Sequence, residues 1–131
     1  MTESFVTAVL CIDGRFRRCL VEWVTAHFGI DYVDLVTEPG PDRVLAEDSF
    51  GPQAEGVRSR LEVSRTAHKP AAIVIAGHDD CAGNPVDQGI HRIQERRAVT
   101  VLQQWYPDLP ILGLHVDTEC AIHLFADNGE G

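Results

Sequence analysis

Three strand-sized runs of apolar and β-branched residues, separated from one another by helical patterns, constrain the fold of this chain most strongly. Residues 5–10 and 71–76 are continuous runs of this kind, typical of strands covered on both faces. Residues 31–36 indicate a further strand between them. The segment 16–28 carries apolar side chains at every fourth position, as in an amphipathic helix, and Gly29 ends it. This alternation predicts an α/β fold with a mainly parallel sheet and helices on both faces.

The middle of the chain indicates another helix, preceded by several helix-breaking residues. Residues 57–68 have a helical pattern that Pro70 stops. The preceding stretch, 42–56, is polar and contains Gly51 and Pro52. We therefore expect a loop with a short helical turn over 42–56, which could move over a site.

The next helix has the clearest start signal in the sequence. Asn84 is the expected N-cap, Pro85 the first helical residue, and Asp87 lies in the first turn near the positive end of the helix dipole. The same dipole would favour a thiolate at Cys81, just before the helix.

The end of the chain indicates a hairpin, and the length of the chain indicates a single domain. Residues 111–116 and 121–125 are predicted to pair, and residues after Asp127 are expected to fray. With 131 residues and 44% hydrophobic composition, the chain is sized for one compact domain over 1–131 with a single core.

The charge of the chain excludes some classes of partner. A formal net charge of -9 argues against nucleic acid and anionic membranes, because both attract clustered Lys and Arg. The N-terminus lacks a basic start followed by a long apolar stretch, so neither a signal peptide nor a membrane span is expected. A cytoplasmic protein is the resulting expectation.

Four cysteines could form disulfides or bind metal. In a reducing compartment, metal binding is the better use of such residues. We expect Cys11 and Cys81 to bind metal, which leaves Cys19 and Cys120 as small buried hydrophobic residues.

Two short motifs follow predicted buried strands and carry the chemistry of the chain. The first is C-I-D-G-R at 11–15, and the second is G-H-D-D-C at 77–81. Because the carboxyl ends of parallel strands lie at one edge of a sheet, Cys11, His78 and Cys81 are expected to converge. Two thiolates and one imidazole predict a Zn²⁺ site whose fourth position is open to water or a carboxylate.

These motifs resemble those of the β-class carbonic anhydrase family, and the likeness extends over most of residues 5–126. The resemblance implies that the two motifs supply the zinc ligands and an Asp13–Arg15 dyad. It also implies a sheet order of 2-1-3-4 with an antiparallel last strand, and a homodimer or higher homo-oligomer with active sites near the subunit interface. The long N-terminal helical arm of that family has no counterpart in this sequence.

The implied activity is hydration of carbon dioxide to bicarbonate by zinc-bound hydroxide. Asp13 would orient the hydroxide, and Arg15 would hold Asp13 ionised through a bidentate pair. Two alternatives stay open. One is hydrolysis of carbonyl sulfide or carbon disulfide, and the other is a non-catalytic zinc protein in which Asp13 is a permanent fourth ligand.

Other polar residues are expected to have smaller roles. Asp80 is interpreted mainly as an exposed loop carboxylate, with bracing of His78 as the lesser alternative. His115 and His123 alternate with apolar residues, which predicts a solvated strand face. His91 lies within a helix and is interpreted as a packing residue.

Overall fold

The computed structural model describes residues 3–127, so the expectation for residues after Asp127 lies outside the described part of the chain. Strands and helices alternate in the order that the sequence predicts. The elements are β1 (Phe5–Leu10), α1 (Arg17–Phe28), β2 (Tyr32–Thr37), α2 (Pro41–Glu47), α3 (Pro52–His68), β3 (Ile73–His78), α4 (Gln88–Trp105), β4 (Ile111–Val116) and β5 (Ile122–Asp127). No helix in the described range is long and apolar enough to span a membrane.

The five strands form one sheet in the order β2-β1-β3-β4-β5. The first four are parallel, and β5 pairs antiparallel with β4. This confirms the predicted mainly parallel α/β sheet with an antiparallel last strand. The chain leaves β1 toward β2 on one side and returns to β3 on the other, so β1 and β3 flank the switch point where α/β sheets bind ligands.

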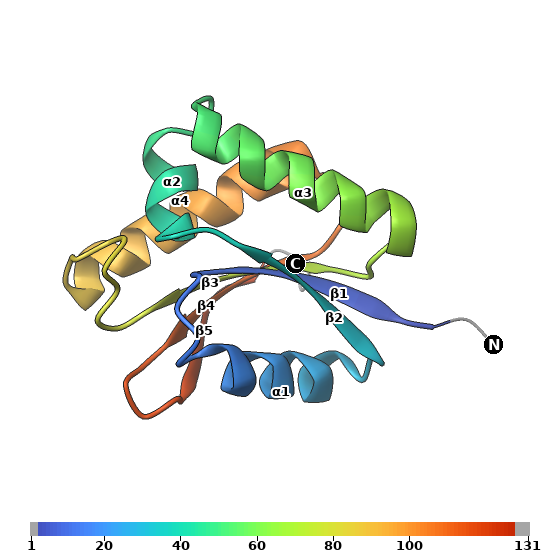
Figure 1. Cartoon of the computed structure of the whole chain (residues 1–131), viewed down its shortest axis with the longest axis horizontal. Helices are drawn as coiled ribbons and strands as arrows, with labels where there is room; N and C mark the ends of the chain where they lie inside the picture. The colour runs from blue at the N-terminus through green and yellow to red at the C-terminus, as the bar shows by residue number, and fades with distance from the viewer. Residues whose placement is uncertain (1–2, 128–131) are drawn as a thin grey trace.

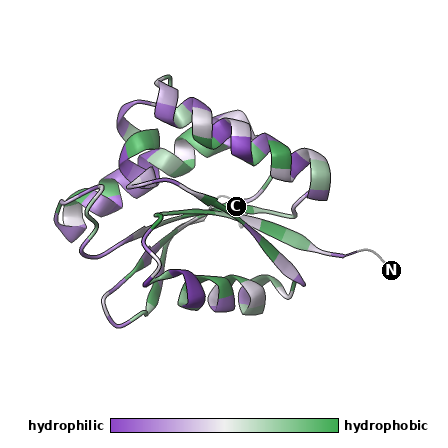
Figure 2. Ribbon diagram, viewed as in Figure 1, coloured by the Kyte–Doolittle hydropathy of each residue, from purple (hydrophilic) through white to green (hydrophobic). Residues whose placement is uncertain are grey.

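Helices cover both faces of the sheet, as predicted. In Figure 1, α1 lies on one face while α2, α3 and α4 lie on the other. Each face has its own apolar cluster, one built around Leu20 and Val24 of α1 and the other around Leu61 of α3 and Leu102 of α4. The inner strands β1, β3 and β4 are predominantly hydrophobic (Figure 2), because both of their faces are covered.

The expectation of a loop over 42–56 is wrong. Most of this stretch is helical, since α2 and α3 begin at Pro41 and Pro52, each placed where a helix needs no backbone donor. Val44 and Leu45 are fully buried, and α2 packs closely against α4. Tertiary packing, which local composition does not reveal, therefore makes this segment part of the core.

The predicted start of the next helix is also wrong. α4 begins at Gln88, and its N-cap is Asp87, whose carboxylate accepts a hydrogen bond of 2.9 Å from the amide of Ile90. Asn84 is instead buried and donates its side-chain amide to Gln94. The positive end of the helix dipole is therefore farther from Cys81 in the sequence than we predicted.

Cys19 and Cys120 are joined by a disulfide, which corrects the expectation of two unlinked buried thiols. The bond ties α1 to the turn between β4 and β5. The two residues are 101 positions apart, so sequence spacing gave no sign of the pairing.

Candidate metal centre

The two sequence motifs meet at the carboxyl edge of the sheet. Cys11 directly follows β1, His78 ends the neighbouring β3, and Cys81 lies in the loop that follows. One ligand atom from each of these residues lies within 4.8 Å of the others. All three residues are buried, with exposed fractions of 6%, 3% and 4%. The fold therefore brings together the three side chains that the sequence predicted would converge.

The geometry of these side chains suits zinc. The Cys11 and Cys81 Sγ atoms are 3.9 Å apart, close to the edge of about 3.8 Å that tetrahedral Zn–S bonds of about 2.3 Å require. His78 Nδ1 lies 2.7 Å from the carbonyl oxygen of Asp79, an acceptor, so Nδ1 carries the proton. The other ring nitrogen, Nε2, is buried without a partner among the described residues. A buried nitrogen with a free lone pair is what a metal ligand requires.

Asp13 lies beside this group and is held by Arg15. The guanidinium donates from Nη2 to Asp13 Oδ2 at 2.6 Å and from Nε to Asp13 Oδ1 at 3.0 Å, and the Arg15 amide donates to Oδ1 at 3.0 Å. These hydrogen bonds lower the pKa of Asp13 from 3.8 to about 2, despite the opposing effect of desolvation. They also raise the pKa of Arg15. Asp13 is therefore a carboxylate at every pH near neutrality.

Asp80 does not brace His78. Its carboxylate is 76% exposed and accepts a hydrogen bond of 3.2 Å from Arg15 Nη1, while its carbonyl oxygen accepts from Arg15 Nη2. His78 uses the carbonyl of Asp79 instead. The main expectation, an exposed loop carboxylate, is confirmed, and Asp80 links the second motif to the Asp13–Arg15 pair.

A small hollow adjoins the candidate ligands. It is lined by Cys11, Asp13 and His78 and by apolar side chains that include Leu20 and Val116. The ring of Phe16 also lines it and stacks on His78, with centroids 4.5 Å apart. The hollow therefore brings apolar side chains next to the atoms expected to hold a metal.

The prediction for His115 is wrong, whereas His123 is exposed as expected. β4 lies between β3 and β5 under α4, so both of its faces are covered and His115 is buried. Its Nδ1 contacts Glu95 Oε2 at 2.9 Å, and its Nε2 contacts Asp79 Oδ1 at 2.8 Å. These interactions raise the pKa of His115, outweighing the desolvation that would lower it. Alternation along a strand could not distinguish this central position from an exposed one.

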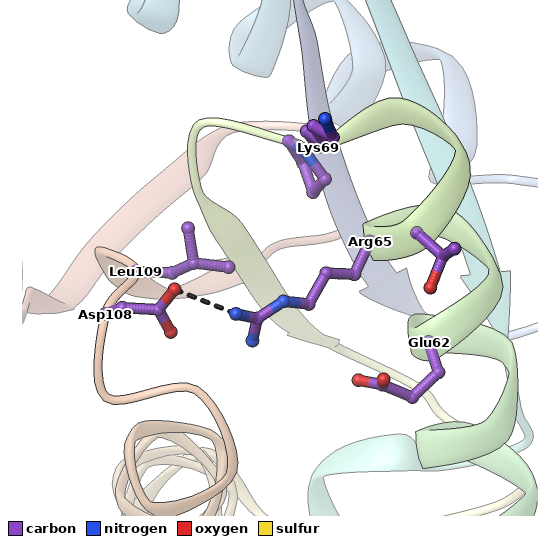
Figure 3. A pocket seen from close by; sticks show the side chains of 7 residues that line it. Glu62, Arg65, Lys69, Asp108 and Leu109 are labelled. Atoms are coloured by element: carbon purple, nitrogen blue, oxygen red, sulfur yellow. Dashed lines mark hydrogen bonds and ion pairs between the residues drawn. The ribbon is translucent and has the colours of Figure 1, made fainter.

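An open pocket lies far from these motifs along the sheet. Glu62, Arg65 and Lys69 of the α3 end face Asp108 and Leu109, which precede β4 (Figure 3). This is the amino edge of the parallel strands, opposite the edge that carries Cys11 and His78. Arg65 donates to Asp108 at 2.9 Å, and Glu62 accepts a hydrogen bond of 2.6 Å from the Tyr106 hydroxyl.

Comparison with known proteins identifies both the fold and the family. The fold is similar to that of a chain described under the crystal structures of two tetrameric β-carbonic anhydrases from Sordaria macrospora, with TM-score 0.65 and 14% identity over 96% of this chain and 82% of that one. It is also similar to the β-carbonic anhydrase CafA of Aspergillus fumigatus, with TM-score 0.62 and 13% identity over 95% of this chain and 76% of that one. No curated protein sequence matches this chain significantly. The family model described as "Putative carbonic anhydrase" matches residues 1–126, almost the whole sequence. The chain therefore belongs to the putative carbonic anhydrase family and has the fold of the β-carbonic anhydrases.

Proposed function

We propose that this protein hydrates carbon dioxide to bicarbonate, releasing one proton, at a zinc ion bound by Cys11, His78 and Cys81. The observation that carries the proposal is the convergence of two buried thiols and an unpartnered imidazole nitrogen beside an ionised carboxylate. When bound, zinc supplies a nucleophile by lowering the pKa of water.

The residues around the metal position supply orientation. Asp13 remains ionised and would accept a hydrogen bond from the nucleophile, which would orient it toward the carbon atom of the substrate. Arg15 fixes Asp13 through its bidentate pair, so the carboxylate does not turn away. The apolar side chains that line the hollow suit an uncharged substrate better than an ion.

The Asp13–Arg15 pair favours the catalytic function over a closed zinc site. Both carboxylate oxygens of Asp13 accept hydrogen bonds from Arg15, which holds them away from a permanent role as fourth ligand. Carbonyl sulfide and carbon disulfide are also linear and uncharged, so they are the substrates to assay next if carbon dioxide is not hydrated.

We expect turnover to rise from neutral toward alkaline pH. Two thiolates and one neutral imidazole cancel the charge of zinc, so this site acidifies water less than a three-histidine site, where the pKa is about 7. Asp13, with a pKa of about 2, contributes no inflection in this range. Stopped-flow hydration by zinc-quantified protein at a series of pH values measures the profile.

Cys81→Ser provides the control for this experiment, because it removes a ligand and should abolish both turnover and zinc binding at the cysteine site. If the parent protein shows no turnover at any pH in the series although it is fully loaded with zinc, the proposal is overturned. A profile that falls toward alkaline pH would contradict the assignment of the nucleophile.

We further propose a homodimer or larger homo-oligomer. The Sordaria macrospora enzymes of this fold are tetrameric. This chain also exposes several large apolar side chains, among them Phe50 at 96%, Val63 and Ile12. Light scattering coupled to size exclusion should give a mass of at least twice 14.4 kDa. A monomer mass at every concentration tested would contradict this expectation.

A further inference from the structure

A second group of side chains that could bind a metal lies next to Gly77 of β3, the strand that ends at His78. His91 and Glu95 come from α4, and His115 comes from β4 beneath it. One candidate ligand atom from each lies within 4.8 Å of the other two, and the exposed fractions of the residues are 1%, 0% and 2%. Residues at positions i and i+4 share one helix face, so the spacing of His91 and Glu95 presents both to the same strand.

Each imidazole of this group is anchored by a carboxylate at one nitrogen. His91 Nδ1 lies 2.8 Å from Asp42 Oδ2, and His115 Nε2 lies 2.8 Å from Asp79 Oδ1. Metal-binding histidines characteristically donate one ring N–H to a carboxylate, which orients the ring and leaves the other nitrogen as the ligand. His91 therefore has a free nitrogen as metal binding requires, whereas His115 Nδ1 also contacts Glu95 and would release its proton when a metal binds.

The remaining nitrogens point to the same place. His91 Nε2 is buried and has no hydrogen-bond partner among residues 3–127. His115 Nδ1 faces Glu95 Oε2 at 2.9 Å. The other oxygen of this carboxylate, Glu95 Oε1, is also buried and unpartnered in the described chain. Folded proteins rarely leave buried polar atoms unsatisfied, so two such atoms in one cluster indicate a missing partner.

The charge of the cluster indicates that the partner is a cation. The carboxylates of Asp42 and Glu95 approach each other above Gly77, which lacks a side chain. A Cβ atom there would overlap the Glu95 carboxylate and lie 2.8 Å from Asp42 Oδ2. Desolvation and the neighbouring charge of Asp42 raise the pKa of Glu95, while His115 opposes this shift. Both carboxylates contact imidazoles, and a divalent ion would replace the proton between His115 and Glu95.

We propose that His91, Glu95 and His115 bind a divalent first-row transition-metal ion, with Zn²⁺ as the representative ion, separate from the cysteine site. Imidazole nitrogens and a carboxylate oxygen are suitable ligands for such ions. Asp42 and Glu95 together balance the charge of the ion. Because all three ligands are buried, the ion has a structural role and links α4 to the central strand β4. The proposal does not rest on the carbon dioxide activity.

The metal content of the full chain tests this proposal. After zinc loading and gel filtration, we expect about two zinc ions per chain in the parent protein, measured by mass spectrometry of the metal. Glu95→Gln and Cys81→Ser should each lower the content to about one, by emptying different sites. His123→Gln is the matched control, since this exposed histidine also pairs with an aspartate, Asp117, and its loss should leave the content unchanged.

Cobalt identifies which site remains in each variant. Cobalt-loaded Cys81→Ser should show absorption from cobalt d–d transitions without the thiolate-to-cobalt charge-transfer band, whereas Glu95→Gln should keep that band. A parent protein that binds about one zinc, unchanged in Glu95→Gln and lost in Cys81→Ser, would overturn the proposal.

The parent protein provides a readout that needs no variant to fold. X-ray absorption at the zinc edge reports the average number of sulfur ligands per zinc ion. Two zinc ions, of which one is bound by two thiolates, give an average of about one sulfur. An average of about two sulfurs at full loading would show that zinc occupies the cysteine site alone and would refute the second site.

Discussion

We expect replacement of Asp13 by asparagine to slow the proposed carbon dioxide hydration about 100-fold and to leave the zinc content unchanged. Asparagine keeps the size of the side chain but removes the charge that pairs with Arg15 and the acceptor that orients the nucleophile. Because Asp13 lies outside the group of Cys11, His78 and Cys81, zinc binding should survive. Stopped-flow hydration and metal analysis of the same preparation measure both effects.

Arg15→Gln separates the charge of Asp13 from its orientation. Without the guanidinium, the pKa of Asp13 should return from about 2 toward 3.8, which still leaves the carboxylate ionised at neutral pH. Loss of turnover in this variant would therefore report orientation alone. Asp80→Asn is the matched control, since Asp80 also contacts Arg15 but is exposed, and its rate should stay near that of the parent. An Asp13→Asn protein with the parental rate would rule out the orienting role.

Removal of the Cys19–Cys120 disulfide is the change with the largest expected effect on stability. The cross-link closes a loop of 101 positions, and loops of about 100 residues contribute about 4.7 kcal/mol at 25 °C in the chain-entropy model. The double variant Cys19→Ser, Cys120→Ser should therefore lose a large part of the total free energy of unfolding. Urea unfolding of the metal-loaded parent and variant measures the difference.

Thiol counting supplies the control for this comparison. Unfolded, metal-free parent protein should present only Cys11 and Cys81 as reactive thiols, the same number as the double variant. Equal unfolding midpoints for the two proteins, with all four parental cysteines reactive, would contradict the presence of the cross-link.

The sequence predicted those features that depend on short patterns and on strand direction. Continuous apolar runs located β1 and β3, and the motifs that follow them had to meet because parallel strands end at one edge. Cys11 and His78 could therefore be placed together although they are 67 positions apart in the sequence. Gly29, in the left-handed conformation that glycine favours, ends α1 as expected.

The features that the sequence did not predict depend on which surfaces pack together. Asn84 has the composition of an N-cap, but its amide is used by Gln94 and Asp42 across the core. Asp42 follows a breaker and appeared to be a loop residue, yet it is buried against His91. His115 alternates with apolar residues as an exposed position would, and only the neighbouring strands and α4 bury it. The burial of Asn84 and Asp42 thus depends on hydrogen-bond partners distant in the sequence, and the burial of His115 depends on the order of the strands.

The cysteines of this protein impose opposite requirements on the solution around it. Cys11 and Cys81 must stay reduced to act as ligands, whereas Cys19 and Cys120 must stay oxidised to keep their bond. In metal-depleted protein, the ligand sulfurs are 3.9 Å apart and free to oxidise to a disulfide of their own. Strong reductant prevents that reaction but also opens the bond between Cys19 and Cys120, which are less buried. The order of steps during purification therefore decides which disulfide is recovered. If metal is added before the reductant is withdrawn, Cys11 and Cys81 are protected while Cys19 and Cys120 form their bond again.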